Sequence, residues 1–130
     1  MIEIVREVPL SQEDAWRRLT DWERHALYVP LTTIRLTAEG FVARTAVGRL
    51  GFDDPMEVVE FDPPSFCRLE KRGNVVAGWA ELHVSPVGSQ SRIVWREDIR
   101  VAWTPKFSGG LTKAVSRRLF SRVIDGLLSN

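Results

Sequence analysis

The sequence is poor in the features that mark secreted and membrane proteins. It has one cysteine, Cys67, so an internal disulfide is impossible, which suits a reducing cytoplasm. No stretch approaches the ~20 apolar residues of a membrane-spanning helix. The N-terminus lacks the basic segment and apolar core of a secretory signal. We therefore expect a cytoplasmic protein with no integral membrane segment.

The sequence also lacks a large excess of positive or negative charge, because the net charge is only +1. A dedicated nucleic-acid binder needs a surplus of Lys and Arg on one face to neutralise phosphates. Basic residues do gather after Gly109, but acidic residues elsewhere balance them. We interpret them as the solvated face of a helix and expect no nucleic-acid partner.

Motifs that hold metals, cofactors or catalytic nucleophiles are missing as well. Two histidines and one cysteine do not supply a zinc site. Asp53 and Asp54, with Glu57 nearby, offer too few oxygen ligands for a calcium loop, and Asp53-Asp54-Pro55 is interpreted as a turn or the start of a strand. There is no phosphate loop, dinucleotide fingerprint or nucleophile elbow. We expect no metal and no cofactor.

What the sequence does contain is a pattern of strand, two short helices, several strands and a final helix. Residues 2–8 alternate as a strand, and Ser11 is placed to cap a helix from Gln12 to about Leu19. A second short helix is predicted from Trp22 to about Tyr28. Alternation then predicts strands near residues 32–38, 41–49, 56–61, 66–72, 75–84 and 92–103. Short connections between them indicate an antiparallel meander.

The final helix, from Gly109 onward, is amphipathic. Its apolar stripe contains Leu111, Val115, Leu119, Phe120, Val123, Ile124, Leu127 and Leu128. A sheet that closes on such a helix predicts an α+β fold, and the 130 residues fit one domain spanning 1–130. Folds of this layout often hold a pocket between the two layers.

Several phrases of the sequence resemble a known superfamily in their order and spacing. They are Val8-Pro9 followed by Ser11, Asp21-Trp22-Glu23 through Val29-Pro30, Phe61-Asp62-Pro63-Pro64, and residues 79–84 followed by 92–95. Together they resemble the Bet v1-like, or SRPBCC/START-like, superfamily, and within it the bacterial polyketide cyclase/dehydrase and lipid-transport-like group. The resemblance implies a helix-grip fold: a curved antiparallel sheet of about six to seven strands around a long C-terminal helix. It also implies a cavity between sheet and helix.

Strand parity nominates residues that face this cavity. On the last strand Ile93, Trp95, Ile99, Val101 and Trp103 share one face, and Glu97 has the same parity. A carboxylate on an apolar face needs a partner, or its pKa rises. Arg6 has the inward parity of the first strand and could meet Glu97 if these strands pair. The competing interpretation is a structural ion pair, or a Glu97 placed near the strand end.

The second short helix carries three aromatic side chains that could close the mouth of the cavity. Trp22, His25 and Tyr28 are spaced three apart and share a face. His25 is suited to proton transfer, although a surface histidine beside two core aromatics would look the same in sequence. The expected lining is completed by Phe52, Met56, Trp95, Phe120 and Ile124.

These observations support three hypotheses. The first is a non-catalytic protein that binds a hydrophobic small molecule, such as a lipid, isoprenoid or aromatic polyketide. The second is a polyketide cyclase, aromatase or dehydratase in which Glu97 or His25 is the acid/base and Arg6 holds an oxyanion. The third is an interaction module in which the short helices or Trp79 dock a partner, a homodimer being one such assembly.

Overall fold

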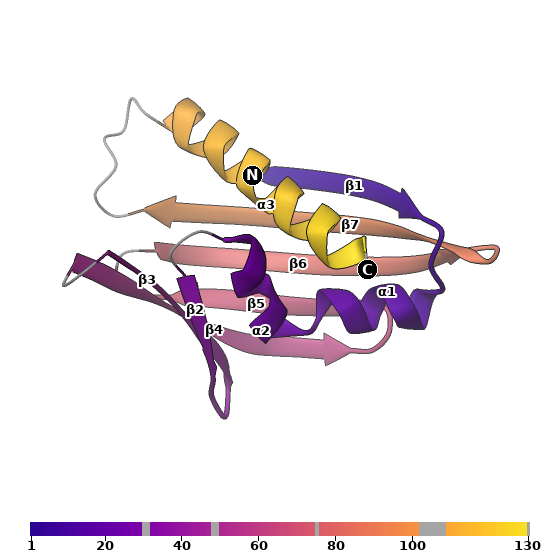
Figure 1. Cartoon of the computed structure of the whole chain (residues 1–130), viewed down its shortest axis with the longest axis horizontal. Helices are drawn as coiled ribbons and strands as arrows, with labels where there is room; N and C mark the ends of the chain where they lie inside the picture. Colours follow the sequence, from indigo (N-terminus) through magenta and orange to yellow (C-terminus); the bar gives the residue numbers. More distant parts are fainter. Residues whose placement is uncertain (30–31, 48–49, 75, 102–108, 130) are drawn as a thin grey trace.

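The computed structural model describes residues 1–29, 32–47, 50–74, 76–101 and 109–129. Within these ranges, one seven-stranded antiparallel sheet has the strand order β1-β7-β6-β5-β4-β3-β2 and curls around the C-terminal helix (Figure 1). The predicted order of strand, two short helices, strands and long helix is confirmed. The elements are β1 (Ile2–Val8), α1 (Gln12–Leu19), α2 (Trp22–His25), the 3-10 helix η1 (Ala26–Tyr28), β2 (Thr32–Leu36), β3 (Gly40–Val47), β4 (Leu50–Asp62), β5 (Phe66–Arg72), β6 (Val76–Val87), β7 (Gln90–Val101) and α3 (Gly109–Leu128).

The two helices after β1 begin where the sequence predicts. Ser11 caps α1, and its side-chain oxygen accepts a hydrogen bond from the Asp14 backbone N–H at 3.2 Å. Ala15, Trp16 and Leu19 form the buried face of α1. These helices fill the space at one side of the sheet, so the chain can return to begin β2.

Strand β4 starts earlier than the sequence suggested. Asp53-Asp54-Pro55 lies inside the strand, where it pairs with residues 42–44 of β3, so the alternative of a turn is wrong. The strand tolerates Pro55 because β5 pairs with β4 only from Met56 onward, so the missing N–H breaks no bond on that side. This extension places Asp54 within the sheet rather than in a loop.

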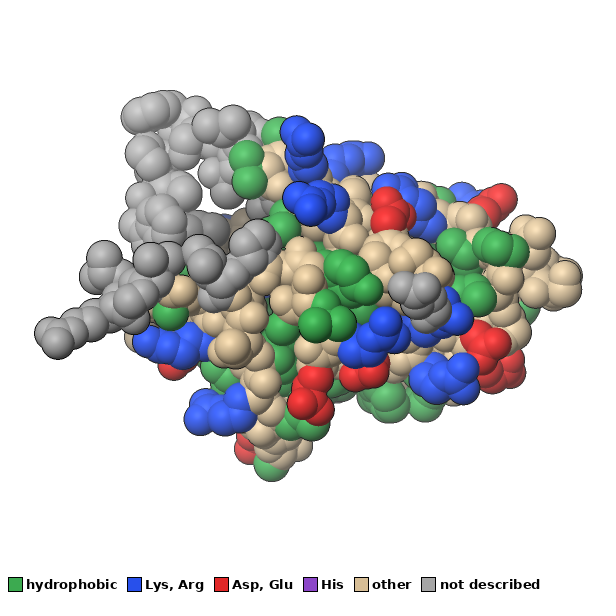
Figure 2. Space-filling view, in the orientation of Figure 1, with side chains coloured by type: hydrophobic (Ala, Val, Ile, Leu, Met, Phe, Trp, Pro, Cys, Tyr) green, Lys and Arg blue, Asp and Glu red, His purple; other side chains and the backbone are tan. Residues whose placement is uncertain are grey.

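Helix α3 covers the concave face of the sheet with its second half. Val123, Ile124, Leu127 and Leu128 are buried, whereas Val115 is 60% exposed, so the predicted stripe does not reach the core along its whole length. The side chain of Leu111, and all of Trp103, lie outside the described residues. Basic side chains gather on the exposed side of α3 (Figure 2). No helix in the described part of the chain is long and apolar enough to span a membrane.

Candidate functional site

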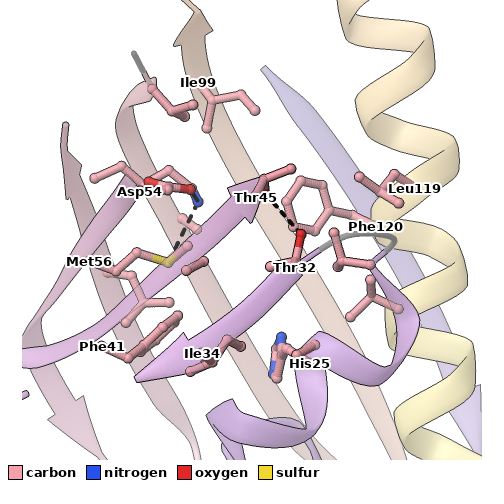
Figure 3. Close-up of a pocket in the computed structure, with 18 of the residues that line it drawn as sticks. His25, Thr32, Ile34, Phe41, Thr45, Asp54, Met56, Ile99, Leu119 and Phe120 are labelled. Atoms are coloured by element: carbon pink, nitrogen blue, oxygen red, sulfur yellow. Dashed lines mark hydrogen bonds and ion pairs between the residues drawn. The ribbon is translucent and has the colours of Figure 1, made fainter. Parts of the chain in front are cut away.

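A cavity of about 200 Å³ lies between the concave face of the sheet, α2 and α3 (Figure 3). Most of the side chains that line the cavity are apolar, and only a few are polar. The described lining residues are His25, Ala26, Val29, Thr32, Ile34, Phe41, Ala43, Thr45, Phe52, Asp54, Met56, Leu69, Lys71, Val76, Ala80, Trp95, Ile99, Leu119, Phe120 and Val123. A small number of polar groups in an apolar wall is typical of a small-molecule site.

Aromatic rings give this wall its rigidity. Trp95 of β7 stacks with Phe120 of α3, their ring centroids 6.1 Å apart, so sheet and helix meet at this pair. Behind the lining, Trp22 stacks on Phe41 with centroids 5.0 Å apart. Large rings with few rotatable bonds hold a preformed shape at little entropic cost.

The cavity also has a polar corner, which we define as Asp54, Lys71 and Glu97. The Lys71 Nζ donates a hydrogen bond to the Asp54 Oδ2 at 2.9 Å and lies 3.5 Å from the Met56 Sδ. The two charged side chains are only 4% and 13% exposed. An ion pair this buried must hold its geometry, because either charge alone would be costly away from water.

Alternation along β5 aims Lys71 at the cavity. Cys67, Leu69 and Lys71 are buried on the concave side. In β6 the residue opposite Lys71 is Gly78, whose φ is +135° and where any Cβ would collide with the Asp98 backbone oxygen. Glycine is therefore required here by the close approach of the β7 backbone.

Glu97 lies one row further along the sheet and is fully buried. It pairs with Ala80 of β6 and Ile2 of β1, and neither carboxylate oxygen has a well-formed hydrogen bond among the described residues. Burial raises the pKa of Glu97 to about 7, against the opposing influence of the Lys71 charge and the nearby Trp95 indole N–H. The inward parity predicted for Glu97 is confirmed. Glu97 therefore carries its proton at slightly acidic pH.

His25 sits at the opposite side of the cavity. Its Nε2 lies 2.8 Å from the Leu19 carbonyl oxygen, which can only accept, so this nitrogen carries the hydrogen. Burial lowers the pKa of His25, so the ring is neutral at pH 7 and Nδ1 is an acceptor without a hydrogen-bond partner in the described structure. The ring is 5.5 Å from that of Trp22 and 6.5 Å from that of Trp95.

Comparison with known proteins decides the family. The sequence matches, over residues 1–130, the family described as polyketide cyclase / dehydrase and lipid transport. The chain belongs to this family. No curated protein sequence matches it significantly.

Solved structures show that this member of the polyketide cyclase/dehydrase and lipid transport family has the helix-grip fold. The protein TTHA0849 from Thermus thermophilus is 18% identical, with a TM-score of 0.69 over 98% of this chain and 91% of that one. The ZhuI aromatase/cyclase from Streptomyces sp. R1128 is 16% identical, with a TM-score of 0.71 over 98% and 90%. Ara h 8.0201 is 13% identical, with a TM-score of 0.70 over 99% and 97%. The Bet v1-like resemblance of the sequence is therefore confirmed.

Within this family member, most expected lining residues meet in the cavity. Phe52, Met56, Trp95 and Phe120 line it together with His25. Ile124 is buried in the core beside the lining residue Val123. Trp22 packs behind the wall, and the Tyr28 ring lies against Gly126 of α3, where a Cβ would strike it.

The expected meeting of Arg6 and Glu97 is wrong. β1 does pair with β7, but the register sets Arg6 opposite Ile93 and Glu97 opposite Ile2. Arg6 instead donates from Nε to Asp125 of α3 at 2.8 Å and is partly exposed. Arg6 thus connects β1 to the helix and stands outside the cavity.

Trp79 lies on the outer face of the sheet. It is half-buried there, with the Arg68 guanidinium 4.7 Å from its ring centroid. β6 pairs with β7 residue for residue through Gly78, so Trp79 keeps the outward parity of its strand. The homodimer and the cytoplasmic location stay predictions.

Sequence reasoning missed two residues of the polar corner, Asp54 and Lys71. Lys71 shares the parity of Cys67 and Leu69, which was a usable signal, but a lysine near a strand end usually points to solvent. Asp54 stands beside a proline in a pattern typical of turns. Among the described residues, no group of three or more His, Cys, Asp or Glu is placed to hold a metal ion.

Proposed function

We propose that the protein binds a hydrophobic small molecule in the cavity between the sheet and α3. The observation that carries this proposal is the cavity itself, lined by aromatic and aliphatic side chains from β3, β4, β7 and α3. Its volume of about 200 Å³ exceeds the ~150 Å³ cavity that accepts benzene in another protein, so a ligand of about two rings fits. Burial of apolar ligand surface, worth about 25 cal/mol per Å² before ordering costs, supplies the affinity.

A cyclase- or dehydratase-type reaction is the second candidate, and the polar groups in the cavity favour it. The neutral His25 offers Nδ1 as a base, and Lys71 offers an ammonium that would stabilise a developing oxyanion. The apolar wall would hold a flexible substrate folded so that one intramolecular condensation is favoured. This role replaces the one first considered for Arg6, which lies outside the cavity.

Native mass spectrometry of the protein from its own host tests both candidates. We expect a small molecule that stays bound under native conditions and leaves on denaturation. An uncyclised apolar ligand supports the binding role, whereas a cyclised product supports the enzyme. Mutation of His25 to Ala should abolish any turnover, because the ring supplies the base.

A matched pair of variants shows whether the ligand occupies this cavity. Ala43 and Ala46 are both on β3, but only Ala43 lines the cavity. Ala43→Phe fills the cavity and should reduce ligand occupancy at least about tenfold, because the ligand must give up its space. Ala46→Phe should retain the ligand. Equal occupancy in both variants would place the ligand elsewhere and overturn the proposal.

A further inference from the structure

We propose that the polar corner selects ligands whose polar group is a neutral hydroxyl and rejects ligands that carry a carboxylate. This inference rests on the proposed binding function, because it names the chemical class of the ligand's polar group. It rests on the three side chains of the polar corner, which comprise two acids and one base and leave an N–H of the base able to donate to a ligand.

The charges of the corner favour a neutral ligand. Lys71 is the single Lys or Arg among the described residues that line the cavity. Its Nζ already forms an ion pair with the Asp54 Oδ2 at 2.9 Å. Glu97 lies close enough to interact with Lys71 electrostatically. When both acids are ionised, two carboxylates face one ammonium. A ligand carboxylate would add a third negative charge to a region with little water to screen it.

The hydrogen bonds favour a group that both donates and accepts. The Lys71 Nζ has three N–H groups, of which one goes to Asp54 and one faces the sulfur of Met56. Nζ also lies 6.0 Å from the centroid of the Phe120 ring, and among the described residues the third N–H has no hydrogen-bond acceptor, so it can donate to a ligand. The Trp95 Nε1 has almost no exposed surface and lies beside Glu97, so it stays within the protein. The acceptor beside Lys71 is the Asp54 carboxylate, whose side chain lines the cavity and is 13% exposed. A hydroxyl can accept from Lys71 and donate to Asp54, whereas a carboxylate can only accept.

Glu97 acts on the ligand through Lys71, because it lies behind the lining rather than in it. The charged groups that act on it are Lys71 of β5 and Asp54 of β4. From β1 it meets Ile2, and α3 contributes apolar side chains to the cavity. Its pKa of about 7 means that the corner gains a negative charge as pH rises through neutrality. His25 is already neutral in this range, because its pKa lies below 6.5.

Three probes of equal ring size test the proposal: naphthalene, 2-naphthol and 2-naphthoate, with affinities measured by equilibrium dialysis. At pH 8 we expect 2-naphthol to bind about tenfold more tightly than naphthalene, from its hydrogen bonds to charged groups. We expect 2-naphthoate to bind at least about tenfold more weakly than 2-naphthol. The naphthoate should bind several-fold more tightly at pH 6.5 than at pH 8, as Glu97 takes up its proton.

Variants that remove one negative charge sharpen the test. Glu97→Gln and Asp54→Asn should each tighten 2-naphthoate binding about tenfold at pH 8 relative to 2-naphthol binding by the same variant. Glu97→Gln should also abolish the pH dependence of naphthoate binding, which a merely structural role would not do. Glu70→Gln is the control, because Glu70 points to the opposite side of β5 and pairs with Arg72 at 2.6 Å.

The outcomes separate this inference from the proposed function. If naphthalene binds but 2-naphthoate binds as tightly as 2-naphthol, the inference is overturned and the binding function stands. If folded Glu97→Gln and Asp54→Asn leave naphthoate binding unchanged, the inference is also overturned. If none of the three probes binds, both fail. Should one variant not fold, the other variant and the wild-type ranking still decide.

Discussion

Strand β5 contributes to two ion pairs that lie on opposite faces of the sheet. On the outer face, Arg68 meets Glu81 at 2.6 Å, with side chains 30% and 18% exposed. On the inner face, Lys71 meets Asp54 at 2.9 Å with almost no exposure. Water can solvate either outer charge if its partner is lost, but it reaches the inner charges less easily, above all the Lys71 ammonium at 4% exposure. The outer ion pair lies on the surface of the sheet, whereas both side chains of the inner pair line the cavity.

The largest expected effect comes from breaking the inner pair. Lys71→Met keeps the length of the side chain but leaves Asp54 and Glu97 without a cation. We expect the free energy of unfolding at pH 8 to fall by about 3–5 kcal/mol, since a buried charge loses its partner. Urea denaturation followed by tryptophan fluorescence measures this change.

The matched control is Arg68→Met on the outer face. A partly exposed ion pair contributes about 0–1 kcal/mol, so this variant should stay close to the wild type. Part of any loss would come from the contact between Arg68 and Trp79. Equal losses in the two variants would contradict the distinction between the faces.

A somewhat smaller effect is expected from Glu97. In the folded chain Glu97 keeps its proton up to about pH 7, but in the unfolded chain it loses it near pH 4.5. The folded state thus binds more protons between these values, and stability falls as pH rises through this window, by about 3 kcal/mol in total. Glu97→Gln should remove this slope. Urea denaturation of both proteins at pH 5 and pH 8 measures it, and an unchanged slope in the variant would exclude Glu97 as its source.

The sequence predicted the fold well, because the signals are local and repeated. Alternation in β7 places Ile93, Trp95 and Glu97 on the concave face, and Ser11 starts α1 where its side chain can cap. Each such pattern depends on a few neighbouring residues and on periodicity alone.

The polar corner was only partly predictable, because it is assembled from three strands. Glu97 could be found from parity, whereas its partner depends on the register between strands, which sequence patterns do not specify. The register places Met56, Lys71 and Gly78 in one row across the sheet, and it sets Arg6 opposite Ile93. The position of Lys71 also depends on Asp54 lying in a strand that continues through a proline.

The smallest expected effect concerns the ion pair between Arg6 and Asp125, which joins β1 to α3. Its side chains are 36% and 55% exposed, so it resembles the outer pair of β5 although it spans two layers of the fold. Arg6→Gln should lower the free energy of unfolding by about 0.5 kcal/mol, and 1 M salt should remove most of the difference, since solvent ions screen exposed charges. Urea denaturation at low and high salt checks this. Binding of 2-naphthol should not change, because Arg6 stands outside the cavity, so a loss of binding would mean that the position of α3 depends on this pair.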